Sequence, residues 1–79
     1  MSVRVVYYAM LRERRGQSTE TVATQSATAA DLYDELNRAH GLKLPRAALR
    51  VSVNGVISSW DTALAEGDEV AFLPPVSGG

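Results

Sequence analysis

The sequence predicts an α+β fold, in which a mixed sheet of about five strands carries one main helix on one face. Three observations support this prediction. Segments rich in β-branched and aromatic residues lie near both ends of the chain, one amphipathic helical segment lies near its middle, and an Asn54-Gly55 pair marks a β-hairpin. The 79 residues are enough for one domain with a thin core.

The first strand is expected at Val3–Ala9, a β-branched and aromatic segment. Arg4 should point to water, and period-two alternation then places Val6 and Tyr8 on the same outward face. The core-facing residues of this strand would be Val3, Val5 and Tyr7. A short helical turn or loop follows at Met10–Arg15, ended by Gly16. A second strand at Thr19–Thr24 should pair with the first as a hairpin.

The main helix is predicted to span residues 29–40. Thr28 suits the N-cap, and Asp31 completes an acidic variant of the capping box at the positive helix end. Gly41 suits the left-handed position that ends the helix. Apolar residues at three- and four-residue spacing form one stripe, which comprises Leu32, Tyr33, Leu36, Ala39 and His40.

Three short strands should follow the helix. They are expected at Leu49–Val53, at Val56-Ile57 after the Asn54-Gly55 turn, and at Glu69–Leu73, where Pro74 removes a ladder donor. The first and last strands are the richest in apolar residues, so they should lie side by side and parallel at the centre of the sheet. This arrangement is the β-grasp, or ubiquitin-like, fold. The expected division is a domain at residues 1–73 and a flexible Gly-Gly tail at residues 74–79.

Composition excludes several functions. The net charge is −1 and is spread evenly along the chain, and the basic stretch around Arg12 is interrupted by Glu13 and too short for a nucleic-acid footprint. No apolar run is long enough to cross a membrane, and the start of the chain has no signal-peptide pattern, so a cytoplasmic location is the default. The chain has no cysteine and a single histidine, His40. We therefore expect no metal site, no bound cofactor and no catalytic set of its own.

The end of the chain is the most informative segment. Gly78 and Gly79 form a tip without side chains, and Pro74-Pro75 stiffens the exit from the last strand. Six extended residues reach at most about 20 Å, so this tip could present its carboxylate inside a narrow site of another protein. On the tail alone, a frayed terminus is an equally good interpretation. An ionised carboxylate is a poor electrophile, so its use as an acyl group requires activation by a partner.

A second candidate site is an apolar patch beside the tail. Alternation places Val6, Tyr8 and Leu73 on the free face of the sheet, and Ile57 is expected to join them. Such a patch on a small domain indicates a binding surface. The alternative is that these side chains are merely scattered.

Three segments carry a resemblance to a known family: Val5–Ala9 with Leu11–Glu13, the pair Val53-Asn54, and above all Leu64–Gly79. The chain resembles the MoaD/ThiS family of ubiquitin-like sulfur carriers. The ending Pro-Pro-Val-Ser-Gly-Gly is typical of the branch that forms the small subunit of molybdopterin synthase. The departures are mild, since Tyr7 and Tyr8 stand where phenylalanine is common.

The resemblance implies a two-stage cycle and assigns its residues. An ATP-dependent partner enzyme adenylates the carboxylate of Gly79, and a sulfur donor converts it to a thiocarboxylate. The tail then enters the large catalytic subunit in a heterotetramer and passes its sulfur to precursor Z, cyclic pyranopterin monophosphate, to form molybdopterin. The tail-insertion residues would be Pro74, Pro75, Val76, Ser77 and Gly78. The partner-binding residues would be Val6, Tyr8, Ile57 and Leu73.

Three alternatives stay open. The chain could carry sulfur for thiamine synthesis or tRNA thiolation, although the double proline argues against this. It could be a ubiquitin-like modifier conjugated to lysines through Gly79, or a plain binding module with an inert tail. Lys43 is the only lysine of the chain. This argues only against the building of branched chains and not against conjugation to other proteins.

Overall fold

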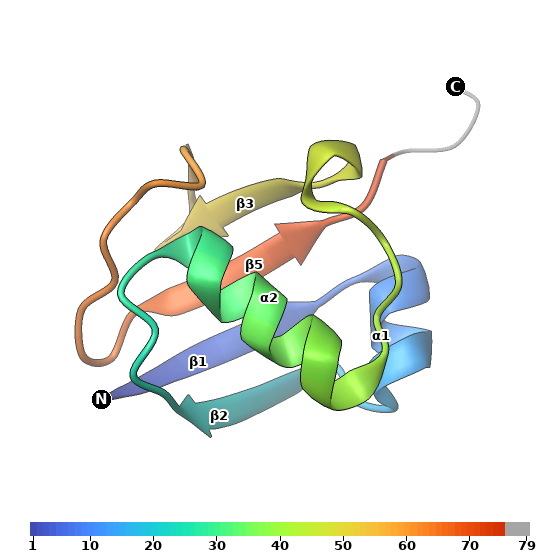
Figure 1. Cartoon of the computed structure of the whole chain (residues 1–79), viewed down its shortest axis with the longest axis horizontal. Helices are drawn as coiled ribbons and strands as arrows, with labels where there is room; N and C mark the ends of the chain where they lie inside the picture. Colours follow the sequence, from blue (N-terminus) through green and yellow to red (C-terminus); the bar gives the residue numbers. More distant parts are fainter. Residues whose placement is uncertain (76–79) are drawn as a thin grey trace.

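The computed structural model describes residues 1–75, which form a five-stranded mixed sheet with one main helix lying across one face (Figure 1). The order of strands in the sheet is β2-β1-β5-β3-β4. The elements are β1 (Ser2–Tyr7), α1 (Ala9–Arg15), β2 (Thr19–Ala23), α2 (Ala29–His40), the 3-10 helix η1 (Arg46–Ala48), β3 (Arg50–Val53), β4 (Val56–Ser58) and β5 (Glu69–Leu73).

The first and last strands form the centre of the sheet. β1 and β5 are parallel, in a register that pairs Val5 with Val70 and Tyr7 with Phe72. β1 pairs antiparallel with β2, and β5 pairs antiparallel with β3. The prediction of a β-grasp fold with parallel terminal strands is therefore confirmed, and its basis was the apolar content of those two strands.

Both helices end on the signals that the sequence carries. The backbone N–H of Asp31 donates to the hydroxyl of Thr28 over 3.2 Å, so Thr28 is the N-cap of α2. Gly41 ends α2 and Gly16 ends α1 in the left-handed conformation, with φ of 63° and 85°. The segment expected as a helical turn is thus a seven-residue helix, and Leu11 anchors it in the core.

The apolar stripe of α2 differs in one respect from the prediction. Ala39 is exposed, and the stripe ends at Leu36. Leu42, from the connector after the helix, is fully buried and takes up the core position beyond this point. The core lies between α2 and the covered face of the sheet, and comprises Val3, Val5, Tyr7, Leu11, Ala29, Leu32, Tyr33, Leu36, Leu42, Leu49, Val51, Val70 and Phe72.

Packing among three aromatic rings joins α2 to the central strand β5. Tyr33 of α2 meets Phe72 of β5 edge to face at 5.2 Å between ring centroids, and Trp60 stacks on Phe72 at 6.0 Å. The guanidinium of Arg46 lies 5.9 Å from the centre of the Trp60 ring. Edge-to-face and stacked pairs at these distances stabilise a core beyond the area that they bury.

Hydrogen bonds of Asn54 join the β3–β4 hairpin to the turn that precedes β5. Asn54 and Gly55 adopt positive φ, as the hairpin prediction requires. The Asn54 side chain donates to Asp68 over 2.9 Å and accepts from the backbone N–H of Glu69 over the same distance. The bond from Asn54, followed by one from the N–H of Ala65, lowers the pKa of Asp68. Within residues 1–75, neither helix is long and apolar enough to span a membrane.

We predict that Thr28→Ala lowers the free energy of unfolding by about 1 kcal/mol, because it removes the side chain that caps α2. Thr28→Ser is the matched control, since it keeps the hydroxyl and should stay close to the wild type. Urea denaturation followed by circular dichroism measures both. Equal destabilisation by the two variants would show that the cap contributes nothing.

Candidate functional site

The last strand, β5, is the central strand of the sheet and leads directly into the tail. β5 is hydrogen-bonded on both sides, by β1 and β3, up to the pair formed by Leu73 and Arg50. Leu73 and Pro74 are half-buried, and Pro75 is exposed. The base of the tail therefore leaves from the central strand of the sheet. The predicted tip residues Val76, Ser77, Gly78 and Gly79 lie outside the described residues.

A shallow groove of about 650 Å³ flanks the base of the tail. One side is the segment from Ala47 to Arg50, which includes the end of η1 and the start of β3. The other side is Leu73 with the two prolines. Pro74 is thus partly covered where the chain leaves the sheet, and the fixed φ of both prolines limits the directions that the chain can take.

The free face of the sheet, opposite α2, carries a row of apolar side chains. The strand register aligns Val6 of β1 with Ala71 of β5, then Ser52 of β3 and Ile57 of β4. Val6 is half-buried, Ala71 is 7% exposed, and Ile57 is 55% exposed. Three of the four predicted partner-binding residues, Val6, Ile57 and Leu73, thus share this face. Ala71 belongs with them, and the same alternation that selected Leu73 could have included it.

Tyr8 is the fourth predicted residue, and it lies just beyond the end of β1. Its backbone is extended, with φ −122° and ψ 153°, and it is the N-cap of α1. Continuing the register beyond the pair of Tyr7 and Phe72 brings Tyr8 next to Leu73. Its side chain is 47% exposed. We name the surface formed by Val6, Tyr8, Ile57, Ala71 and Leu73 the free-face patch.

A buried polar cluster fixes the turn between Tyr8 and β2. Glu20 accepts a hydrogen bond of 2.6 Å from the Tyr7 hydroxyl and two of 2.8 Å from the Arg15 guanidinium. The hydrogen bonds from Arg15 lower the pKa of Glu20, and those from Tyr7 act in the same direction. Burial raises the pKa of the Tyr7 phenol, and its bond to Glu20 raises it further. The cluster ties α1 to the β1–β2 hairpin and so holds Tyr8 beside the tail.

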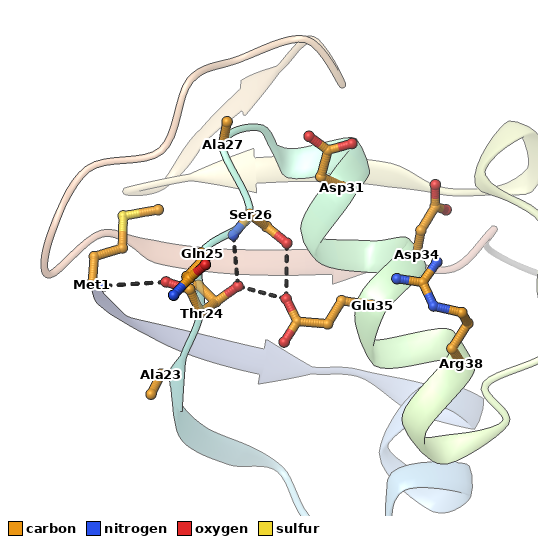
Figure 2. Close-up of a pocket in the computed structure, with 10 residues that line it drawn as sticks. All are labelled: Met1, Ala23, Thr24, Gln25, Ser26, Ala27, Asp31, Asp34, Glu35 and Arg38. Carbon is orange, nitrogen blue, oxygen red and sulfur yellow. Dashed lines mark hydrogen bonds between the residues drawn. The ribbon is translucent and has the colours of Figure 1, made fainter.

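A larger hollow lies on the helix side, near the amino terminus (Figure 2). There the Glu35 carboxylate accepts hydrogen bonds from the hydroxyls of Thr24, at 2.5 Å, and Ser26, at 2.8 Å. These polar groups satisfy one another. No group of His, Cys, Asp and Glu side chains in residues 1–75 is arranged to hold a metal ion. We assign no chemistry to this hollow.

The geometry of a β-grasp domain with a patch beside its tail agrees with comparisons of the whole chain. The sequence profile of the ThiS family matches residues 5–79. The chain belongs to the ThiS family.

Two relatives are 35% identical to it, and both are molybdopterin synthase sulfur carrier subunits. The protein from Escherichia coli aligns over 98% of this chain and 99% of its own length, and that from Mycobacterium tuberculosis over 100% and 99%.

A solved structure has a fold similar to that of this chain. SAMP1 of Haloferax volcanii, a small archaeal modifier protein, superposes with a TM-score of 0.84 at 34% identity, and the match covers 100% of both chains. The predicted family and the ubiquitin-like β-grasp fold are thereby confirmed.

We predict that acid destabilises the domain partly through Glu20. The lowered pKa means that this carboxylate stabilises the fold above its ordinary pKa, and that the contribution is lost as the pH falls towards its pKa in the folded protein. Glu20→Gln should lower the free energy of unfolding at pH 7 by roughly 1–3 kcal/mol, because it removes charge-assisted bonds. It should also flatten the decline in stability below pH 5.

Glu13→Gln is the control, because Glu13 is an exposed carboxylate on α1, the short helix that carries Arg15. It should leave both the stability at pH 7 and the acid dependence close to those of the wild type. An unchanged pH profile in Glu20→Gln would contradict the assigned role of the cluster.

Proposed function

We propose that this chain is the sulfur-carrier small subunit of molybdopterin synthase and that its reactive centre is the carbonyl of Gly79. The full-length likeness to sulfur carrier subunits carries this proposal. The geometry supports it, since the strand that leads to the tail is the central strand of the sheet and the free-face patch lies beside its end. The division into a domain at 1–73 and a tail at 74–79 is part of the proposal.

The proposed chemistry proceeds by acyl activation and sulfur exchange. A partner enzyme attaches AMP from ATP to the Gly79 carboxylate and releases pyrophosphate. A sulfur donor then attacks the acyl adenylate, AMP leaves, and a thiocarboxylate remains. In the large subunit this sulfur passes to precursor Z, and water restores the carboxylate. The chain supplies the acyl group alone, so the acid–base residues belong to the partners.

The tail composition suits this cycle. Gly78 and Gly79 have no Cβ, so their backbone can approach the walls of a narrow active site closely. Pro74 and Pro75 have fixed φ, so these two positions lose little conformational entropy when the tail is inserted. Six residues reach at most about 20 Å from the domain, so any partner that takes the tip must also face the free-face patch.

A second candidate function has one observation in its favour, the likeness to a small archaeal modifier protein. In this role the activated Gly79 would form an isopeptide bond to a lysine of another protein. Lys43 is the only lysine of the chain, so any chain of copies linked through lysine would use this one position.

The mass of the protein isolated from its native host distinguishes the two functions. A sulfur carrier should include a fraction heavier by the exchange of one oxygen atom for sulfur, located in the C-terminal peptide. A modifier should instead appear in isopeptide-linked adducts. Adducts without any thiocarboxylate would overturn the proposed function.

We predict that deleting Gly79, or adding one residue after it, abolishes sulfur transfer in a system reconstituted with the adenylating enzyme, a sulfur donor and the large subunit. The carbonyl would no longer reach the reacting atoms, and a misplacement of one residue is enough to remove catalysis. The melting temperature should stay unchanged, because the core that the structure describes ends at Phe72. Full activity in either variant would rule out the mechanism.

We also predict that Ile57→Asp weakens binding of the large subunit about tenfold or more, because it introduces a charge into the free-face patch. Val56→Asp is the matched control. Val56 is the neighbouring residue on β4 and is 65% exposed, but it points to the opposite face. Calorimetry measures both affinities. Equal losses from the two variants would show that the patch is not the docking surface.

A further inference from the structure

The fold separates charges that are evenly spread along the sequence. β1 and β5 both run towards the end of the molecule from which the tail leaves, and β3 starts there, opposite Leu73 (Figure 1). α1 and the last turn of α2 lie at the same end. All basic residues except Arg4 lie on α1, in the last turn of α2, at the start of β3 or in the segment between α2 and β3, whereas the far end carries Asp31, Asp61, Glu66, Asp68 and Glu69.

Only part of this basic charge is neutralised within the domain. Arg15 pairs with Glu20 at 2.8 Å, and Arg46 pairs with Asp34 at 3.2 Å. The remaining basic residues at this end are all exposed, and we name them the basic end: Arg12, Arg14, Arg38, Lys43 and Arg50. Arg14 donates to the Leu42 carbonyl at 2.7 Å, which leaves its charge in place. Glu13, between Arg12 and Arg14, is the one exposed carboxylate on α1.

The basic end lies at the base of the tail, so a partner that binds the tail comes close to these charges. Arg50 is paired in register with Leu73, one residue before Pro74, so a cation stands at the base of the tail and beside the free-face patch. The reach of about 20 Å for the tail brings the basic end against the surface that surrounds any tail-accepting site. At physiological ionic strength charges act over about 8 Å, so the basic end acts on that surface and not on distant ones.

From this placement, and resting on the proposed function, we propose that the basic end docks on an acidic protein surface around the entrance of the tail-accepting site. An apolar patch with a charged margin is the usual composition of a protein interface. Complementary charge at such a margin raises the association rate more than it raises the affinity. The separation of charge also turns the tail, rather than the opposite end, towards an acidic partner before contact.

A protein surface fits the basic end better than nucleic acid does. Its five cations lie on four different segments, interleaved with Glu13 and with the neutralised pairs, and do not form a continuous stripe along one element. Nucleic-acid sites combine such a stripe with many phosphate contacts. The apolar residues next to Arg50 also suit a protein partner.

The test is stopped-flow association with the large synthase subunit and, separately, with the adenylating enzyme, at several salt concentrations. Arg50→Glu and Arg4→Glu form a matched pair, because both residues are exposed strand residues on the free face and both changes alter the charge equally. Arg4 is paired with Glu69 of β5 and Arg50 with Leu73, and these two β5 residues are four positions, or about 13 Å, apart. Arg12→Glu, on α1, is a second test variant outside the sheet.

Arg50→Glu and Arg12→Glu should lower the association rate roughly five- to tenfold at low salt with at least one of the two partners, and the loss should shrink towards twofold or less in 1 M salt. Arg4→Glu, which replaces the partner of Glu69 at the far end, should lower the rate less than either variant of the basic end at every salt concentration. Melting curves verify that all three variants are folded.

Three results would overturn the proposal: equal rates for all variants, faster association of the glutamate variants, or a loss that does not depend on salt. Salt-sensitive binding of a DNA or RNA duplex that Arg12→Glu and Arg50→Glu abolish would assign the basic end to nucleic acid instead. In this experiment the proposed function fails separately, when the wild-type chain binds neither protein at any salt concentration.

Discussion

The parallel pairing of β1 with β5 is the constraint on which the rest of this structure depends. It joins the two ends of the chain at the centre of the sheet, so the strand that leads to the tail has hydrogen-bonded neighbours on both sides. Phe72, between Tyr33 and Trp60, fixes the same strand to the helix. Pairing between strands so far apart in sequence is entropically expensive to form, and burial of both strands stabilises it.

This arrangement gives the two faces of the sheet different surroundings. The covered face of the sheet is used for stability, and the free face is available for a partner because no second helix packs on it within residues 1–75 (Figure 1). The cluster of Tyr7, Arg15 and Glu20 keeps α1 and Tyr8 beside the exit of the tail. The base of the tail, at Leu73 and Pro74, therefore lies next to Arg50 at the edge of the free-face patch.

Most of the fold could be predicted because local signals agreed with one another. Thr28, Gly41, Asn54-Gly55 and Pro74 each mark the end or the turn of an element, and period-two alternation placed Val6 and Leu73 on one face. Ala39 was misplaced because helical spacing does not reveal that Leu42 fills the core past the last turn. The separation of charge could not be seen in the sequence, since it arises only when antiparallel strands bring Arg12 and Arg50 to the same end.

The central claim is that a partner receives the Gly79 carbonyl while the sheet stays outside and docks by its free face. A crystal structure of this chain bound to the large synthase subunit tests it most directly. The account predicts that Gly79 lies in the active site of the large subunit and that Ile57 and Arg50 contact the surface around the entrance. A complex in which the large subunit covers α2, with Gly79 outside its active site, would contradict the account.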